Sequence, residues 1–229
     1  MTSVPSLGSA PKAVCFDLDG TLLDSLDDLA DSMNAALREF GHPEHPTRDY
    51  RYFVGEGARL LVQRTLPEGH CDPGTIEAVF QRYQSIYHAN WNNKTRPYSG
   101  IPELLDALQA RGLPLTVLSN KPHASTVKCV AEMLGRWKFE MILGQREAVP
   151  RKPDPAGVLE IAETLQLAPG DLLYLGDTAV DMQTASSAGC IAIGVLWGFR
   201  EAEELWENGA QHLIETPLEL LELLPPSGG

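Results

Sequence analysis

Two aspartates directly after a short apolar run are the first residues of this sequence that could take part in chemistry. Residues 13–16 read Ala-Val-Cys-Phe, which is typical of a buried strand, and Asp17, Asp19 and Gly20 then favour a turn. Ligands of open α/β sheets bind just beyond the carboxyl ends of the strands. An isolated Asp-x-Asp also fits loop acids that cap the next helix, so its meaning depends on the rest of the chain.

Further polar side chains follow other apolar runs. Ser119 comes directly after the run 113–118, and Asp177 follows the run 172–175 at a distance of two residues. Helical patterns separate these runs, and strands that alternate with helices predict right-handed crossovers and a parallel sheet. Because the carboxyl ends of parallel strands lie at the same edge, we expect these acids and hydroxyls to meet there.

Acidic side chains dominate this predicted edge. Asp17, Asp19, Asp177 and Asp181 would place up to four negative charges around one pocket. Carboxylates at close range raise each other's pKa or need a cation, and a divalent ion is the usual partner. Ligand sets made only of oxygen favour Mg²⁺ over zinc or copper, and bound Mg²⁺ also bridges to phosphate oxygens.

Other groups near this edge suit the remaining oxygens of a phosphate. Lys152, the hydroxyl of Ser119 and free backbone N–H groups could all act as donors. Each residue also has a plainer interpretation. Ser119 fits a turn or cap, Lys152 fits a solvated surface cation, and Asp181 fits an exposed acid in the first turn of its helix.

The chain is organised as an α/β core with a helical insertion. Residues 24–95 contain helical patterns and no strand candidate, whereas strands and helices alternate from residue 98 onward. We therefore predict a core formed by residues 1–23 and 96–229 and a helical domain formed by residues 24–95.

Composition limits the class of protein. The chain has 229 residues, of which 43% are hydrophobic and 21% charged, as in a soluble globular enzyme, and it has no apolar run long enough to span a membrane. Residues 1–11 lack the apolar core of a signal peptide, so we expect a frayed tail and a cytoplasmic protein. The net charge of −13 argues against nucleic acid and anionic membranes as partners. We expect a small-molecule substrate and a monomer or homodimer.

Four segments in this order resemble the motifs of the haloacid dehalogenase-like hydrolase superfamily. They are Asp17-Leu-Asp19-Gly-Thr21, Leu118-Ser119-Asn120, Lys152-Pro153 and Gly176-Asp177-Thr178-Ala-Val-Asp181. The resemblance covers essentially the whole chain and implies a doubly wound parallel sheet, Rossmann-like, with a helical cap inserted after the first strand.

The resemblance also implies a role for each motif residue. Asp17 would be the nucleophile that forms an aspartyl-phosphate, and Asp19 would act first as general acid and then as general base. Asp17, the backbone carbonyl of Asp19, and Asp177 would hold Mg²⁺. The phosphate would be bound by Ser119, Asn120 and Lys152, with Thr21 and Asp181 supporting the site.

Three segments, one in the insertion and two in the core, resemble the bacterial phosphoglycolate phosphatases. The similarity rests on residues 53–64 together with Pro97-Tyr-Ser-Gly100 and Ser119-Asn-Lys121-Pro122. Backbone N–H groups near the glycines could approach a small anion, and either arginine could pair with a substrate carboxylate, although both arginines also fit a solvated helix face. The candidate substrate-reading residues are Gly55, Glu56, Gly57, Arg59 and Arg64.

Other functions stay open at this point. The nearest is another capped phosphatase that acts on a sugar phosphate, an amino-sugar phosphate or a pyrophosphate, and a phosphomutase would share the same motifs. A metal-free dehalogenase has no need for the acid at position 19 or for the Gly-Asp-Thr segment. A phospho-receiver module also has an acidic Mg²⁺ pocket, but the insertion and Asp19 favour an enzyme.

Overall fold

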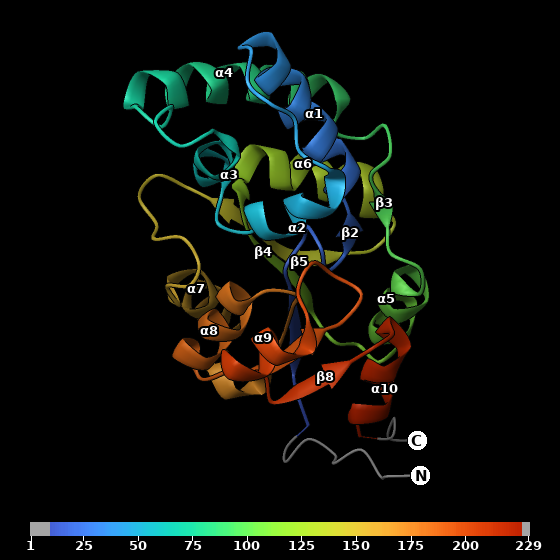
Figure 1. The fold of residues 1–229 in the computed structure, drawn as a ribbon. Coiled ribbons are helices and arrows are strands. Elements are labelled where there is room, and N and C mark those ends of the chain that lie inside the picture. Colours follow the sequence, from blue (N-terminus) through green and yellow to red (C-terminus); the bar gives the residue numbers. More distant parts are fainter. Residues whose placement is uncertain (1–9, 226–229) are drawn as a thin grey trace. The chain divides into compact units, whose positions relative to one another are not determined.

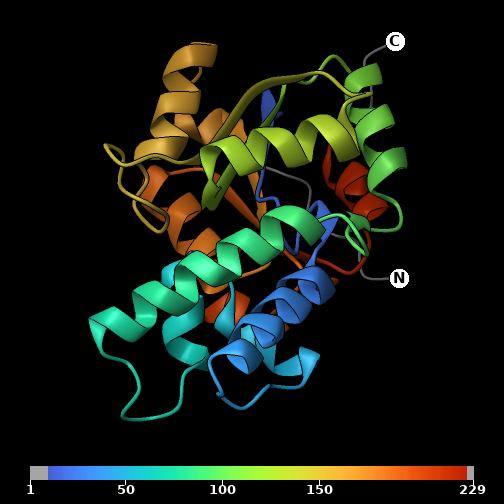
Figure 2. The same cartoon turned by 90° about the horizontal axis from the view of Figure 1, so that it is seen from above.

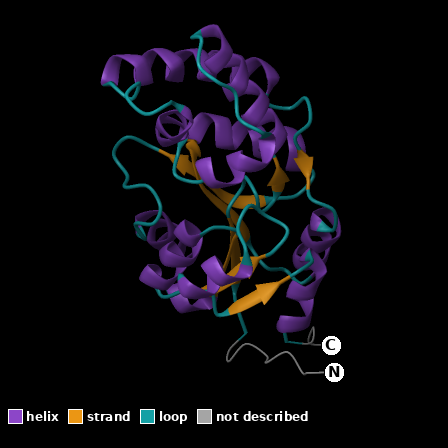
Figure 3. Ribbon diagram, viewed as in Figure 1, coloured by secondary structure: helices purple, strands orange, loops and turns teal. Residues whose placement is uncertain are grey.

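A parallel β-sheet forms the centre of the larger part of the chain in the computed structural model, which describes residues 10–225 (Figures 1 and 3). Its six strands run in the order β5-β4-β1-β6-β7-β8, and each neighbouring pair is parallel. The strands are β1 (Ala13–Phe16), β4 (Leu115–Pro122), β5 (Phe139–Gln145), β6 (Leu172–Gly176), β7 (Ile191–Val195) and β8 (His212–Ile214).

The order of the strands makes the sheet doubly wound. From β1 the chain moves outward through β4 to β5, and it then returns to the other side of β1 to add β6, β7 and β8. Right-handed crossovers place the helices of the two halves on opposite faces. The predicted α/β class with a parallel sheet is confirmed, and the strand order reverses between β1 and β6, where ligands of such sheets bind.

Helices cover the sheet on both faces. The helices α7, α8 and α9 pack side by side, and α5 packs against α10 (Figures 1 and 3). Their bounds are α5 (Ile101–Ala110), α6 (His123–Leu134), α7 (Ala156–Leu165), α8 (Ala179–Ala188), α9 (Ala202–Glu207) and α10 (Leu220–Leu223), with short 3₁₀ turns at Pro169–Asp171 and Pro217–Glu219.

Apolar runs explain why the central strands lie where they do. Every residue of β1 and β6 is buried, as expected for strands that are covered on both faces. The helix α7 lies very close to β4, because a Cβ atom at Gly157 would fall 2.6 Å from Cδ1 of Leu118. Strand β4 also extends beyond Leu118, where the sequence predicted its end, since Pro122 still pairs with Gln145 of β5.

The second unit comprises Leu23–Arg96 and is mainly helical. Long helices α1 and α4 pack against each other, as Figures 1 and 2 show. Its elements are α1 (Leu26–Glu39), the 3₁₀ turn Thr47–Asp49, α2 (Tyr50–Phe53), α3 (Ala58–Thr65) and α4 (Pro73–Asn90). Within the described residues, the first unit runs from residue 10 to Leu22 and from Pro97 to residue 225. The sequence predicted an insertion bounded by residues 24 and 95.

The two ends of the insertion are tied together. Strands β2 (Leu23–Asp24) and β3 (Arg96–Pro97) pair as a two-stranded ribbon. The buried carboxylate of Asp28, near the start of α1, accepts hydrogen bonds from the backbone N–H groups of Lys94 (2.9 Å) and Thr95 (2.8 Å) and from the hydroxyl of Thr95. The acid therefore joins the first helix of the unit to its last segment.

Residues 1–9 of the expected frayed tail lie outside the described residues. Between residues 10 and 225, no helix combines the length and apolar character needed to cross a bilayer.

Candidate active site

Three buried carboxylates meet where β1 and β6 end side by side. Phe16 is in register with Leu175, and the backbone N–H of Asp17 donates to the carbonyl of Leu175 at 2.9 Å. One carboxylate oxygen from each of Asp17, Asp177 and Asp181 lies within 4.8 Å of the others. The sheet edge thus brings together side chains that are more than 150 positions apart in the sequence.

Asp181 lies in the first turn of α8, and its carboxylate is directed back toward the strand ends. It accepts hydrogen bonds from the backbone N–H of Thr178 at 3.1 Å and from the hydroxyl of Thr178 at 2.6 Å. The Tyr174 hydroxyl donates to its other oxygen at 3.3 Å. The side chain is fully buried, so Asp181 does not face solvent.

The buried ammonium of Lys152 joins two of these acids. Its Nζ lies 2.9 Å from Oδ1 of Asp17 and 2.7 Å from Oδ1 of Asp181. The contact with Asp17 is ionic, because that buried oxygen accepts no hydrogen bond of good geometry from the described part of the chain. Lys152 is 4% exposed, so a solvated surface cation does not describe it.

Asn120 fixes the backbone that carries this lysine. Its side-chain amide donates to the carbonyl of Lys152 at 3.1 Å, and its amide oxygen accepts from the backbone N–H of Lys152 at 2.9 Å. Asn120 was predicted to bind phosphate, and these two bonds give it a further task. It positions Lys152.

Burial governs the protonation of the acids. Loss of solvation is the largest cause that raises the pKa of Asp17 to about 7, and the charge of Asp181 adds to it while Lys152 opposes it. The pKa of Asp177 is raised well above its ordinary value by burial first, and then by Asp181 and Asp17. Burial lowers the pKa of Lys152, but the two neighbouring carboxylates outweigh it and the net change is upward.

The three carboxylates carry more negative charge than Lys152 can neutralise, and their oxygens suit a metal ion. One ammonium faces three carboxylates, so the ionised cluster has an excess of negative charge. Buried oxygen donors that lack compensation are the ligands that a hard divalent cation prefers. Asp17, Asp177 and Asp181 offer the clustered oxygens, and the backbone carbonyl of Asp19 was predicted from the family pattern.

Asp177 is held at both carboxylate oxygens. The hydroxyl of Thr21 donates to Oδ1 at 3.1 Å, and the backbone N–H of Phe199 donates to Oδ2 at 2.9 Å. The hydroxyl of Thr21 therefore lies beside the predicted metal ligand Asp177. Sequence reasoning missed Phe199, because a main-chain donor leaves no signal in residue type.

Asp19 has a cationic partner that sequence reasoning did not assign to the site. The Nζ of Lys121 donates to the two oxygens of Asp19 at 3.0 and 2.8 Å, and the lysine side chain is only 6% exposed. Its signal was present in the sequence, since a lysine directly follows Ser119-Asn120. The Oγ of Ser119 accepts the backbone N–H of Lys121 at 3.2 Å, which leaves the hydroxyl proton available for donation.

The candidate substrate-reading residues all lie in the Leu23–Arg96 unit. Gly55 and Gly57 have φ angles of +113° and +94°, which explains glycine at both positions. Arg64 pairs with Glu56 and donates to the carbonyl of Phe53 at 3.2 Å.

The other candidate arginine is engaged in the same way. Arg59 pairs with Glu77, and its guanidinium lies 4.2 Å from the centre of the Phe80 ring. Both arginines therefore have an acidic partner inside their own unit, and a substrate carboxylate would have to replace it.

The raised pKa values of Asp17 and Asp177 predict that the metal-free protein loses stability as the pH rises. Below pH 4, near the pKa of an aspartate in the unfolded chain, such a carboxyl is protonated in both states and does not change the free energy of unfolding. As the pH rises toward 7 and above, the unfolded state ionises more readily than the folded one, so the fold becomes less stable. We expect Asp177→Asn, measured by thermal unfolding in excess chelator, to melt at least about 2–4 °C above the parent at pH 8, with the difference shrinking toward pH 4. The exposed Glu68→Gln change is the control. A variant that melts below the parent at pH 8 would contradict this origin of the shifts.

Comparison with known proteins agrees with the geometry. A family model for haloacid dehalogenase-like hydrolases matches residues 14–195. Phosphoglycolate phosphatases from Nitrosospira multiformis and Chromobacterium violaceum are 33% and 34% identical, and the alignments cover 94% and 93% of this chain and 96% of each relative. The crystal structure of a candidate phosphoglycolate phosphatase from Lactobacillus delbrueckii subsp. bulgaricus has a TM-score of 0.88 and 30% identity, over 94% of this chain and 99% of that one. With a match that runs from β1 to the last residue of β7, and relatives that align over nearly its whole length, this chain belongs to the haloacid dehalogenase-like hydrolases, a family of enzymes.

Proposed function

We propose that the protein is a Mg²⁺-dependent phosphomonoesterase that acts through an aspartyl-phosphate on Asp17, with 2-phosphoglycolate as its substrate. The observation that carries the proposal is the cluster of three buried carboxylates and one buried ammonium at the ends of β1 and β6. Such a cluster can bind a divalent cation and a phosphate together. The names of the curated relatives support phosphoglycolate as the substrate.

In the first half of the reaction, a carboxylate oxygen of Asp17 attacks the phosphorus atom of the monoester. The bond from phosphorus to the ester oxygen breaks, and Asp19 gives its proton to that oxygen, so the alcohol leaves neutral. Lys152 and the hydroxyl of Ser119 offer donors to the phosphate oxygens. Bound Mg²⁺ would offset the negative charge of the acids and of the phosphate.

In the second half, Asp19 takes a proton from a water molecule. The water oxygen attacks the phosphorus atom of the aspartyl-phosphate, the bond to Asp17 breaks, and inorganic phosphate is released with the Asp17 carboxylate restored. The ion pair with Lys121 supports this role because it fixes the direction of the Asp19 carboxylate.

Selection of the leaving alcohol falls to other residues, since the groups around Asp17 address only the phosphate. A substrate carboxylate could be paired by Arg59 or Arg64, which would exchange Glu77 or Glu56 for the substrate. Related phosphatases of sugar phosphates and phosphomutases share the Asp17 chemistry. A screen of phosphomonoesters ranked by kcat/KM, with analysis of the products, separates these activities from hydrolysis of phosphoglycolate.

The nucleophile is tested by Asp17→Asn. We expect turnover to fall by several orders of magnitude, because the amide cannot form the covalent intermediate, while the fold is retained. Mass spectrometry of the parent enzyme, quenched during turnover, should find the phosphoryl group on the peptide that contains Asp17. Asp27→Asn, at an exposed aspartate in the first turn of α1, is the control and should keep activity. A phosphoryl group on Ser119 would overturn the assignment.

Metal dependence is a separate prediction. Removal of divalent ions by a chelator should abolish phosphate release, and added Mg²⁺ should restore it, since the clustered acids need a cation to admit a phosphate. Asp177→Asn should weaken Mg²⁺ binding, measured by calorimetry, more than it raises the KM for the substrate. Full activity in excess chelator would contradict the metal role.

Substrate reading by the arginines is tested with two substrates. Replacement of the arginine that binds the substrate carboxylate, by Arg59→Ala or Arg64→Ala, should raise the KM for phosphoglycolate about ten- to hundred-fold, the value of one charge-assisted contact. The KM for an uncharged phosphomonoester should change far less. Arg82→Ala removes an arginine of the same unit that pairs with Glu39, and it serves as the matched control. Equal effects on both substrates for both arginines would show that neither reads a carboxylate.

A further inference from the structure

The segment after β7 contacts the candidate metal ligand Asp177, although it carries none of the site residues predicted from the sequence. It comprises residues 196–201, between Val195 at the end of β7 and Ala202 at the start of α9, and is called the β7 loop below. The match to the family model ends at residue 195, directly before this loop. Any role of the loop is therefore additional to the motifs discussed so far.

The β7 loop reaches the end of β1 as well as the end of β6. The backbone N–H of Phe199 donates to Oδ2 of Asp177 at 2.9 Å, in a buried position. The indole N–H of Trp197 donates to the backbone carbonyl of Thr21 at 3.0 Å, and the hydroxyl of Thr21 donates to Oδ1 of Asp177 at 3.1 Å. Both oxygens of Asp177 thus have a donor, and the loop supplies one donor and braces the residue that supplies the other.

Steric contacts enclose the same side chain. A Cβ atom at Gly198 would lie 2.2 Å from Cβ of Asp177 and 2.5 Å from the carbonyl oxygen of Gly20. A Cβ atom at Gly20, which has a φ of +92°, would lie 2.2 Å from Oδ2 of Asp177. Glycine at these two positions lets two backbone segments touch the carboxylate, and the side chain has little room to adopt another rotamer.

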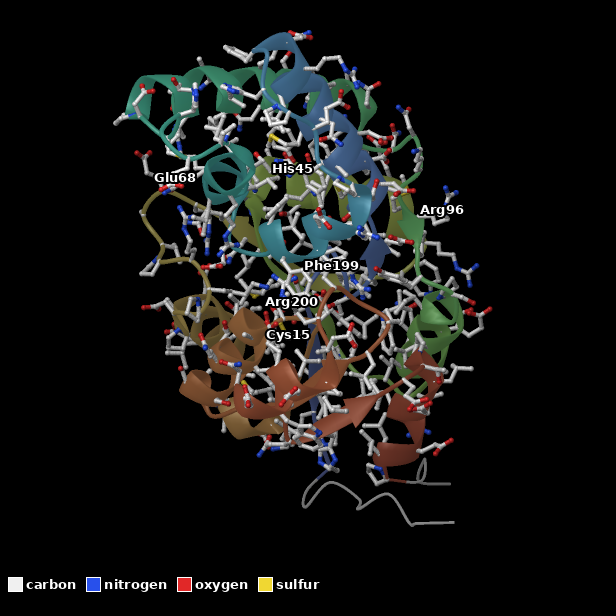
Figure 4. All side chains as sticks on the ribbon, in the orientation of Figure 1. Cys15, His45, Glu68, Arg96, Phe199 and Arg200 are labelled. Carbon is white, nitrogen blue, oxygen red and sulfur yellow. The ribbon has the colours of Figure 1, made fainter. Side chains whose placement is uncertain are left out.

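Contacts on both sides hold the loop in place. At its start, the backbone N–H of Leu196 donates to the carbonyl of Ile214 in β8 at 3.0 Å. At its end, Nε of the buried Arg200 lies 3.2 Å from Oε1 of Glu204 in α9, and Figure 4 labels Phe199 and Arg200 in this segment. That glutamate oxygen also accepts the backbone N–H of Ala179, the first residue of α8, at 3.4 Å. The loop is therefore fixed to β8 at its start and to α9 at its end, and Glu204 links that end to the start of α8.

We infer that the β7 loop is a positioning element for Asp177, in which the N–H of Phe199, the absent side chain of Gly198 and the indole of Trp197 hold the carboxylate in one orientation for a divalent cation. The inference rests on the proposed role of Asp177 as a Mg²⁺ ligand. Each carboxylate oxygen has more than one lone pair, so the two hydrogen bonds leave capacity for a cation. Outer groups that orient a ligand commonly change metal affinity about 10–100-fold when they are removed.

Two variants test this positioning role. Gly198→Ala introduces a methyl group against Asp177, and Trp197→Phe removes the indole donor but keeps an aromatic ring. Trp206→Phe is the matched control, because that tryptophan lies on α9 and is 52% exposed. The first measurement is the Kd for Mg²⁺ by calorimetry on the full-length, metal-free protein without substrate. The second is the Mg²⁺ dependence of phosphate release, with the KM for the substrate at saturating Mg²⁺.

We expect Gly198→Ala to raise the Kd for Mg²⁺ about 10-fold or more and Trp197→Phe to raise it about 3-fold or more, with Trp206→Phe unchanged. Added Mg²⁺ should restore most of the kcat, and the KM for the substrate should stay within about 2-fold of the parent value, which a general loss of structure would not produce. Circular dichroism of the metal-free variants verifies folding. If Gly198→Ala does not fold, Trp197→Phe alone decides the result.

An unchanged Kd for Mg²⁺ in the folded variants would overturn the positioning role, and so would a parent protein that does not bind Mg²⁺. Failure of the proposed activity is distinguishable from both outcomes. A parent that binds Mg²⁺ but releases no phosphate from phosphoglycolate would refute the substrate, while calorimetry would still measure the effect of the loop on the metal site.

Discussion

The buried ion pairs of Lys152 with Asp17 and Asp181 are the interaction on which the rest of the site depends. Removing one partner of a buried pair leaves an uncompensated charge, which commonly costs about 3–5 kcal/mol. Each charge in this cluster therefore needs the others, and the protein must hold all three in place at once. The excess of negative charge that remains is what makes the cluster a receptor for a cation.

The fold meets this requirement with hydrogen bonds from several directions. The amide of Asn120 holds the backbone of Lys152, Thr178 holds Asp181, and Thr21 with Phe199 holds Asp177. These partners come from the end of β4, from the segment after β1, from the start of α8 and from the β7 loop. Because these hydrogen bonds hold the acids in place, less reorganisation is needed when a ligand binds.

The sequence was sufficient to predict the sheet and the acids at its edge, because a buried parallel strand and the polar residues after it leave a clear pattern. Asp17 and Asp177 follow such runs, and the structure brings them together. Other features left a weaker signal or none. The sequence showed a lysine at position 121, but only the structure showed that it pairs with Asp19. Phe199 acts through its backbone N–H, which every residue except proline has, so its side chain gave no indication of this contact.

The partners of the insertion's arginines were also hidden from the sequence. Arg59 and Glu77 lie on different helices, so only the packing of α3 against α4 brings them together, and no local spacing predicts that contact. The short strand β8 leaves little signal in the sequence for a related reason. It has three residues, His212–Ile214, and it acquires its strand character from pairing with β7 rather than from its own composition.

The tie at Asp28 also bears on how this chain could fold. Val14 of β1 pairs with Leu115 of β4, two residues that the whole insertion separates in the sequence. Asp28 and the β2–β3 ribbon bring the two ends of the insertion together, so an insertion that folds first shortens the loop that remains to be closed. Loop-closure entropy costs about 0.6 kcal/mol for each doubling of length, so shortening the loop by roughly fourfold would lower the cost of joining β1 to β4 by about 1 kcal/mol. An insertion whose ends are already joined therefore slows the pairing of β1 with β4 less than its length in residues would suggest.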